Sequence, residues 1–139
     1  MTFDPAFVLV DKAGEWTSHD IVGKARGLFG MKKIGHAGTL DPMATGLVVL
    51  GLGRATRLLR FVQGQPKEYV ATAMFGVATD SLDADGAILD RTAMDVTSED
   101  VAGVVDRFVG DIMQVPPMVS AIKIDGKRLH ALAREGIEV

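Results

Sequence analysis

The pattern of apolar and polar residues predicts both strands and helices along the chain. Phe7–Val10 is a short apolar run that predicts a strand, and Leu47–Leu50 predicts a second, fully buried strand. Between the two runs, apolar residues recur on one face of a helix that we expect over about residues 19–29. Ser18 can cap the start of this helix and Gly30 can end it.

Further along the chain the elements are shorter and are signalled by local motifs. Residues 54–62 predict a helix, and Glu68–Phe75 is rich in β-forming residues and predicts a strand. Thr97 and Asp100 have the spacing of a capping box, which predicts a helix that continues to about Phe108.

The remaining signals concern turns and the last part of the chain. Ser81–Gly86 predicts a turn, Val119–Ile124 a strand, and Asp125-Gly126 a hairpin or tight turn. A last helix is expected from about Lys127 to Gly136. The whole pattern is mixed α/β and lacks the regular strand–helix–strand alternation of a doubly wound sheet.

Composition narrows the possible classes of protein. A chain of 139 residues that is 47% hydrophobic suits one globular domain with a real core. The absence of cysteine excludes disulfides, thiolate nucleophiles and cysteine-based metal sites, and His19, His36 and His130 are too scattered to indicate a metal cluster. We therefore expect no metal and no cofactor.

The N-terminus and the hydropathy pattern bear on location. Asp4 stands where a secretory signal would carry basic residues, and no apolar run approaches the ~18–20 residues of a membrane span. These observations predict a cytoplasmic protein.

Charge is unevenly distributed. The net charge is −3, yet residues 21–70 hold eight basic side chains against two acidic ones, Asp41 and Glu68, a balance of +6. Residues 71–115 hold two basic side chains against nine acidic ones, a balance of −7. Within the basic window, Arg54, Arg57 and Arg60 recur every three residues on one flank of the expected helix. The basic window suits a polyanion such as a nucleic acid, although runs of charge are also common on solvated surfaces.

One loop concentrates candidate chemistry. Residues 35–46, GHAGTLDPMATG, are dense in turn-forming residues and contain one acid, Asp41, directly before Pro42. A proline restricts the backbone of the residue before it, so the position of Asp41 is constrained. An aspartate in such a loop can be a nucleophile, or it can simply cap a turn.

Gly35–Gly46 resembles the catalytic loop of the bacterial tRNA pseudouridine-55 synthases, the TruB family. Further matches follow in the family's order and extend over essentially the whole chain. They are Val10–Lys12, Thr17–Asp20, Arg54–Thr56, Lys67–Tyr69, Gly76, Thr79–Ser81, Asp83–Gly86, Pro116–Lys123, Gly126-Lys127, Ala133-Arg134 and Gly136. One departure is visible near the start, where the family's Asp-Lys-Pro-x-Gly is replaced by Asp-Lys-Ala-Gly-Glu at residues 11–15, which removes a proline and adds an acid.

The resemblance implies an α+β fold with a mixed, largely antiparallel sheet flanked by helices. It also implies that residues 1–139 are the N-terminal part of a pseudouridine synthase catalytic domain. The second half of that domain and the C-terminal RNA-binding region are absent. Strands without their partners should then expose apolar surface.

The same resemblance implies an activity and roles for three residues. The family isomerises a uridine in the T-loop of tRNA to pseudouridine, without cofactor or metal. Asp41 matches the family's nucleophile, which attacks either the anomeric carbon of the sugar or carbon 6 of the base. Tyr69 matches a tyrosine that stacks on the flipped-out base, and His36 matches a histidine that contacts the substrate.

Two other functions remain open at this level. The chain could be a tRNA-binding, folding-assisting module that lacks turnover because the second half is missing. It could also be a pseudouridine synthase with another RNA target, as in the related guide-RNA-dependent synthases. In each case we expect a monomer that binds RNA.

Overall fold

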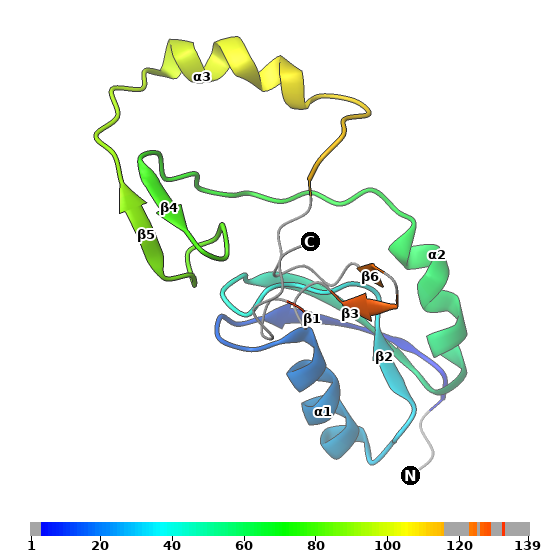
Figure 1. Cartoon of the computed structure of the whole chain (residues 1–139). Coiled ribbons are helices and arrows are strands. Elements are labelled where there is room, and N and C mark those ends of the chain that lie inside the picture. Colours follow the sequence, from blue (N-terminus) through cyan, green and yellow to red (C-terminus); the bar gives the residue numbers. More distant parts are fainter. Residues whose placement is uncertain (1–3, 116–122, 125, 129–131, 133–139) are drawn as a thin grey trace. The chain divides into compact units, whose positions relative to one another are not determined.

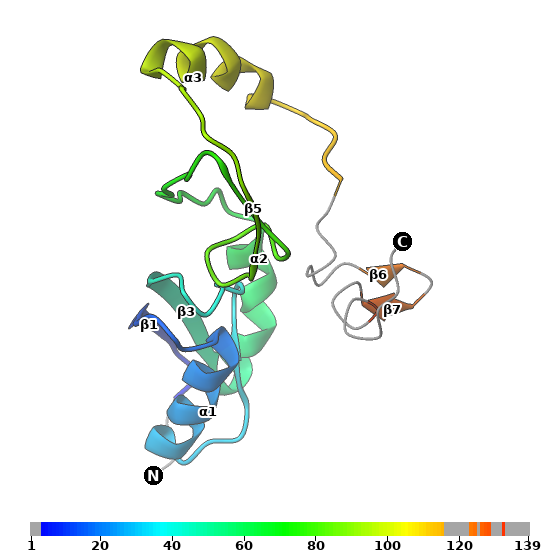
Figure 2. The same ribbon diagram turned by 60° about the vertical axis from the view of Figure 1, so that its left-hand side comes forward.

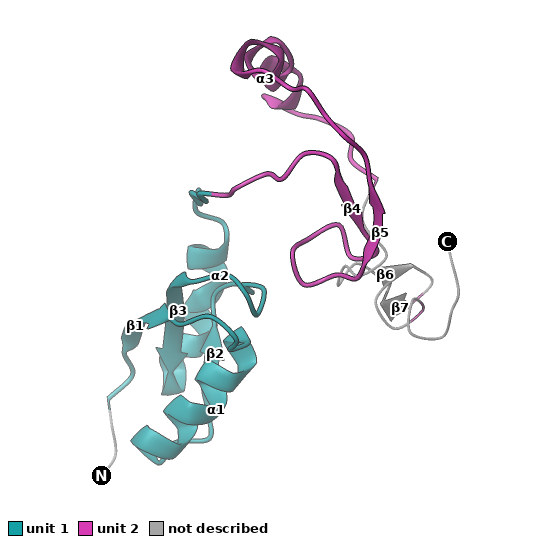
Figure 3. Cartoon of the chain, turned by 90° about the vertical axis from the view of Figure 1, so that its left-hand side faces the viewer, with its two compact units in different colours: residues 1–70 teal, residues 71–139 magenta. Residues whose placement is uncertain are grey.

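The computed structural model describes residues 4–115, 123–124, 126–128 and 132. The chain divides into two compact units, residues 1–70 and residues 71–139 (Figure 3). In agreement with the expected fold class, the described elements are mixed α/β, with small antiparallel sheets and helices.

The first unit is built on a three-stranded antiparallel sheet (Figure 1). Its strands are β1 (Phe7–Lys12), β2 (Ile34–His36) and β3 (Gly46–Leu52), in the order β1-β3-β2. Both predicted strands of this region are confirmed, each with two additional residues or more. The expected loop over residues 35–46 is shorter, because its first two residues belong to β2.

Helix α1 (Ser18–Phe29) confirms the predicted helix but not its predicted cap. Thr17 is the N-cap: its hydroxyl accepts a hydrogen bond from the Asp20 backbone N–H at 3.0 Å, and its own backbone N–H donates to the Asp20 carboxylate at 2.8 Å. The Thr17 hydroxyl also donates to the Asp20 carboxylate, at 2.6 Å, and this bond together with the bond from the Thr17 backbone N–H holds the pKa of Asp20 below its ordinary value. As predicted, the helix ends at Gly30, which adopts a left-handed conformation with φ of 59°.

Helix α1 covers one face of the sheet. Side chains at alternate strand positions point to the same face, so residues 48, 50 and 52 of β3 all meet the helix. The core cluster between them consists of Val22, Ala25, Ile34, Val48, Leu50 and Leu52. The prediction that β3 is fully buried was wrong, because Leu47 is 64% exposed on the opposite face.

A helical segment covers part of that opposite face. It comprises the 3-10 turn η1 (Gly53–Leu58) and helix α2 (Leu59–Gln63), which confirms the helix predicted over residues 54–62. The segment approaches β3 closely at Gly51, where an added Cβ would lie 3.0 Å from the Leu59 side chain and 3.1 Å from the Ala55 backbone. Elsewhere on this face, Phe7, Leu9 and Leu47 are 44%, 68% and 64% exposed, which is the kind of apolar exposure that was expected of strands without partners.

In the second unit, strands β4 (Val77–Thr79) and β5 (Ile88–Arg91) form an antiparallel hairpin (Figure 1); Figure 2 shows β5 from another side. The predicted turn over Ser81–Gly86 lies between them. Helix α3 (Ser98–Val105) begins with the predicted capping box of Thr97 and Asp100, and the 3-10 turn η2 (Asp106–Phe108) extends it to the predicted end.

Strands β6 (Lys123–Ile124) and β7 (Lys127–Arg128) pair around a two-residue turn that contains Gly126 at φ of 83°, as the predicted hairpin requires. The helix expected from Lys127 was wrong at its start, because Lys127 and Arg128 form β7. Apart from Leu132, the rest of that helix lies outside the described residues, as does the predicted strand before Lys123.

The strand predicted over Glu68–Phe75 is also wrong: these residues are outside every described strand. A β-rich sequence becomes a strand only when a neighbouring strand accepts its hydrogen bonds. No described segment pairs with residues 68–75. None of the helices in the described part of the chain has both the length and the apolarity that crossing a membrane requires.

Candidate active site

The loop over residues 37–45, between β2 and β3, carries Asp41 and is held by buried polar side chains. Among the described residues, Lys12 and Ser18 are the buried polar or charged side chains, at 0% and 1% exposure. Lys12 is the last residue of β1 and Ser18 is the first residue of α1. Both side chains bond to the backbone of this loop.

Lys12 makes three hydrogen bonds through its Nζ. The ammonium group donates to the carbonyl oxygens of Ala13 at 3.0 Å, Trp16 at 2.7 Å and Pro42 at 3.0 Å. A lysine ammonium has three N–H groups, so each finds an acceptor and the buried group is fully satisfied. The bond to Pro42 fixes the residue that follows Asp41.

Ser18 fixes the residue on the other side of Asp41. Its Oγ accepts a hydrogen bond of 2.9 Å from the backbone N–H of Leu40. Within the loop, the backbone N–H of Ala44 donates to the Asp41 carbonyl at 3.1 Å and closes a turn. The Asp41 side chain is exposed and makes no hydrogen bond or ion pair with the described residues, so its carboxylate is available while its backbone is restrained.

His36 stands at the end of β2 and contacts the same loop. Its Nδ1 lies 2.6 Å from the carbonyl oxygen of Gly38. Because a carbonyl can only accept, Nδ1 carries the proton in this bond, and Nε2 is the nitrogen left for another partner. His36 pairs with Leu50 and shares the strand face of Ile34, the face that α1 covers.

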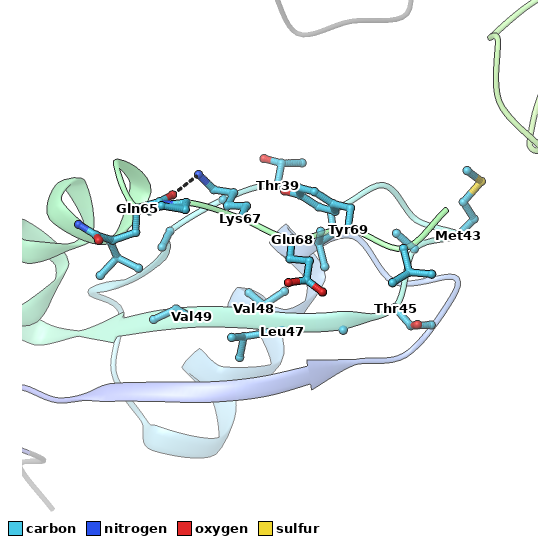
Figure 4. A pocket seen from close by; sticks show the side chains of 18 residues that line it. Thr39, Met43, Thr45, Leu47, Val48, Val49, Gln65, Lys67, Glu68 and Tyr69 are labelled. Carbon is cyan, nitrogen blue, oxygen red and sulfur yellow. Dashed lines mark hydrogen bonds between the residues drawn. The ribbon is translucent and has the colours of Figure 1, made fainter. Parts of the chain in front are cut away.

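A cavity of about 780 Å³ opens on the other side of the loop (Figure 4). Such a volume lies within the usual range for small-molecule sites. Figure 4 shows Tyr69 beside Thr39, with Glu68 directed toward β3. The full lining is residues 37–40 and 43–49, Val62 and residues 65–70.

The structure brings together only part of the predicted site. Tyr69 lines the cavity and is 66% exposed. Asp41 and His36 are not among the lining residues; Asp41 lies in sequence between Leu40 and Met43, which are. The expected nucleophile is thus next in sequence to a lining residue, Leu40, and does not line the cavity itself.

The buried anchors Lys12 and Ser18 were not anticipated as parts of the site. Both fall within segments that match the family, Val10–Lys12 and Thr17–Asp20, and that match was the signal available. Their role follows from long-range contacts: Lys12 and Pro42 are 30 residues apart, and Ser18 and Leu40 are 22 residues apart.

Positive charge adjoins the cavity on the same unit. Arg54, Arg57 and Arg60 are exposed on η1 and α2, and none forms an ion pair within the described part of the chain. The guanidinium of Arg60 lies over the ring of Phe61, 4.7 Å from its centroid. Unpaired cations on one helical flank attract anionic ligands such as phosphates.

The described residues contain no group of three or more histidine and acidic side chains placed to hold a metal ion.

The sequence that forms the restrained Gly-His-Ala-Gly-Thr-Leu-Asp-Pro loop and lines the adjoining cavity matches a known protein family. Residues 26–139 match the family described as TruB family pseudouridylate synthase (N terminal domain), and the chain belongs to this family. The resemblance noted from the sequence is thereby confirmed.

Individual relatives are named tRNA pseudouridine synthase B. The chain is 51% identical over 136 residues to the protein of Leifsonia xyli subsp. xyli, 50% over 133 residues to that of Mycobacterium leprae, and 52% over 133 residues to that of Paenarthrobacter aurescens. Each match covers 95% of this chain but only 45%, 42% and 43% of the respective relative. The chain thus spans less than half the length of these curated relatives.

Proposed function

We propose that this chain is the N-terminal part of the catalytic domain of a tRNA pseudouridine synthase that converts uridine 55 of the T-loop to pseudouridine. The observation that carries the proposal is the double anchoring of the Asp41 backbone, through Leu40 and Pro42, in a loop whose Leu40 and Met43 line a cavity of about 780 Å³. Membership of the family and the names of the relatives support the same reaction.

In the proposed reaction the uridine leaves the base stack and enters the cavity. Unstacking is required because the reacting bond is otherwise enclosed within the folded loop of the RNA. The ring of Tyr69 stacks on the extruded base, and phosphates on either side of it bind the basic surface of residues 21–70. His36 contacts the substrate through its free Nε2.

Asp41 acts as the nucleophile. Its carboxylate attacks either the anomeric carbon of the ribose or carbon 6 of the uracil. The bond between N1 and the ribose breaks, the uracil turns within the cavity, and carbon 5 bonds to the ribose. The proton on carbon 5 then leaves to solvent, N1 takes up a proton and the carboxylate is released. Reactant and product are isomers, so the reaction as proposed uses no cofactor and no metal.

Tritium release tests this proposal. Unmodified tRNA carrying tritium at carbon 5 of its uridines is incubated with the purified chain, and tritium in water is counted. Release must accompany the new bond at carbon 5. We expect release by the chain and none by Asp41→Asn, with Asp4→Asn, an exposed acid outside the loop, as the matched control.

A second function remains: a tRNA-binding, folding-assisting module without turnover. In this alternative the basic surface of residues 21–70 binds tRNA without the isomerisation step. Binding of tRNA without tritium release would favour this module and contradict catalysis by the chain itself. In both cases we propose a monomer acting in the cytoplasm.

A further inference from the structure

A second concavity lies on the first unit, away from the lining of the Tyr69 cavity. It is a trough of about 540 Å³ that begins before α1 and runs along the first two turns of that helix. We call it the Trp16 trough; its residues are Glu15, Trp16, His19, Asp20, Gly23 and Lys24. Apart from Lys24, which belongs to the basic surface of residues 21–70, none of them was assigned a role in the proposed reaction.

The trough offers a flat aromatic surface beside an open floor. Trp16 is 40% exposed, although a tryptophan usually buries most of its surface. Gly23 presents no side chain, and a Cβ added there would meet no atom within 4 Å. Gly23 therefore leaves open space at the helix surface among the residues of the trough.

The polar groups of the trough favour a ligand that both donates hydrogen bonds and carries negative charge elsewhere. The carboxylate of Asp20 is already bonded to the backbone and hydroxyl of Thr17, at 2.8 and 2.6 Å. Glu15, in contrast, makes no hydrogen bond with the described residues and can accept from an amino or imino group. Lys24 supplies a cation one turn beyond Asp20.

The side chain of Lys12 connects the trough to the loop that carries Asp41. The Nζ of Lys12 donates both to the carbonyl of Trp16, at 2.7 Å, and to the carbonyl of Pro42, at 3.0 Å. A ligand that orders Trp16 therefore acts on the same ammonium group that positions the residue after Asp41.

From this arrangement we propose that the Trp16 trough binds a second, unpaired nucleobase of the RNA substrate, stacked on Trp16 with its N–H edge toward Glu15. The inference rests on the proposed function, because the occupant is a part of the same RNA. The first unit, residues 1–70, holds nine basic side chains against six acidic ones, a balance of +3, which favours a polyanion over an acidic peptide surface. Stacking of bases on exposed aromatic side chains is the usual way in which proteins hold unpaired nucleotides.

The fluorescence of Trp16 provides a direct test, since it is the only tryptophan in the chain. Unmodified tRNA is titrated into the full chain, and emission is followed alongside independent measurement of binding by filter retention. We expect quenching that saturates at the same tRNA concentration as binding. The control is the double variant Trp16→Phe/Leu28→Trp, in which the indole lies on α1 at a position that is 71% exposed and outside the trough. The emission of this variant should not change.

A second test blocks the trough without disturbing the fold. Gly23→Leu fills the floor, and Gly27→Leu, one turn further along α1, is the matched control because a Cβ there also meets nothing within 4 Å. Loss of one stacked base weakens tRNA binding by about 10-fold. We expect that loss for Gly23→Leu alone, with unchanged circular dichroism for both variants.

The outcomes separate this inference from the proposed function. If tRNA binds but Trp16 emission stays constant, or if the two leucine variants bind tRNA equally well, the inference is overturned while the proposed function stands. If the chain does not bind tRNA at all, both are overturned. Quenching together with the selective loss in Gly23→Leu supports the inference even where tritium release fails.

Discussion

The Nζ of Lys12 lies 3.0 Å from the carbonyl oxygen of Pro42, so the last residue of β1 holds the residue directly after Asp41. The same ammonium group bonds to the carbonyls of Ala13 and Trp16, and the side chain is completely buried. A single side chain therefore connects the end of a strand, the segment that enters α1 and the loop with the expected nucleophile.

We predict that Lys12→Met destabilises the chain by on the order of 2–3 kcal/mol, because it leaves three carbonyl groups without their charged donor. Urea denaturation followed by circular dichroism measures this change. Tritium release should fall as well under conditions in which the variant is folded. Lys32→Met, an exposed lysine beyond α1, should leave the stability unchanged. Equal stability of the Lys12 and Lys32 variants would contradict the anchoring role.

Ser18→Ala should destabilise the chain by about 1–2 kcal/mol, because the Leu40 N–H loses its acceptor. Ser98→Ala is a close control: Ser98 is also the first residue of a helix, directly after a threonine N-cap with an aspartate three positions on. The Ser98 hydroxyl makes no hydrogen bond with the described residues, so its removal should be neutral. Differential urea denaturation of the two variants checks the prediction.

Glu15→Gly should stabilise the chain by about 1 kcal/mol. Glu15 has a φ of 67°, a left-handed conformation that glycine adopts without the steric penalty of a side chain. The position is also where the family's Asp-Lys-Pro-x-Gly has glycine. Glu15→Ala separates backbone strain from charge, because it removes the carboxylate but keeps the Cβ. A thermal unfolding temperature raised in the glycine variant but not in the alanine variant would confirm that the backbone is responsible.

Gly51→Ala should destabilise the first unit by about 1–3 kcal/mol, a typical effect of overpacking. The added Cβ would lie 3.0 Å from the Leu59 side chain and 3.1 Å from the Ala55 backbone, and the backbone cannot move aside as a flexible side chain can. Gly38→Ala, in the loop and without any atom within 4 Å, serves as the control. Chemical denaturation of both variants measures the difference.

The capping box of α1 should make stability depend on pH at the acidic end. Hydrogen bonds from Thr17 hold the pKa of Asp20 below its ordinary value of 3.8. The folded chain thus holds the ionised form more strongly than the unfolded chain does, so the contribution is complete above the unfolded pKa. It is lost as the pH falls through the lower pKa of the folded state.

We therefore expect the unfolding temperatures of the wild-type chain and of Asp20→Asn to differ most above about pH 5 and to converge as the pH is lowered toward about 2. Replacement of the partner tests the cause. In a Thr17→Val background the pH-dependent part of the difference should become smaller, because the hydroxyl bond is lost while the backbone N–H of residue 17 still donates to the carboxylate. A difference that stays constant across this range would exclude the ionised capping bond as its source.

Features set by neighbouring residues were predictable from the sequence. The helix at Thr97 and Asp100 was recognised from its capping box, and the hairpin at Gly126 from its turn signal. At α1 the identical Thr-Ser-x-Asp spacing was present, yet Ser18 was expected to be the cap. The correct choice requires knowing that the Ser18 hydroxyl is occupied by Leu40, which is 22 residues away.

Features set by distant partners were not predictable in this way. Glu68–Phe75 has the composition of a strand but no described strand pairs with it. Lys12 looked like an ordinary lysine at the end of an apolar run, and nothing local indicates that its amine meets Pro42. Asp41, His36 and Tyr69 were proposed from the resemblance. The cavity that Tyr69 lines and the sheet face on which His36 lies could be seen only in the assembled structure.

The contacts that anchor the loop span residues 12–42, and the cavity lining ends at Val70, where the first compact unit also ends. A chain grows on the ribosome from its N-terminus, at roughly 5–20 residues per second. Among the described residues, the groups that anchor the Asp41 loop and line its cavity are therefore synthesised before the second unit begins. The Asp41 loop can make these contacts early in translation, while the second unit is still being made.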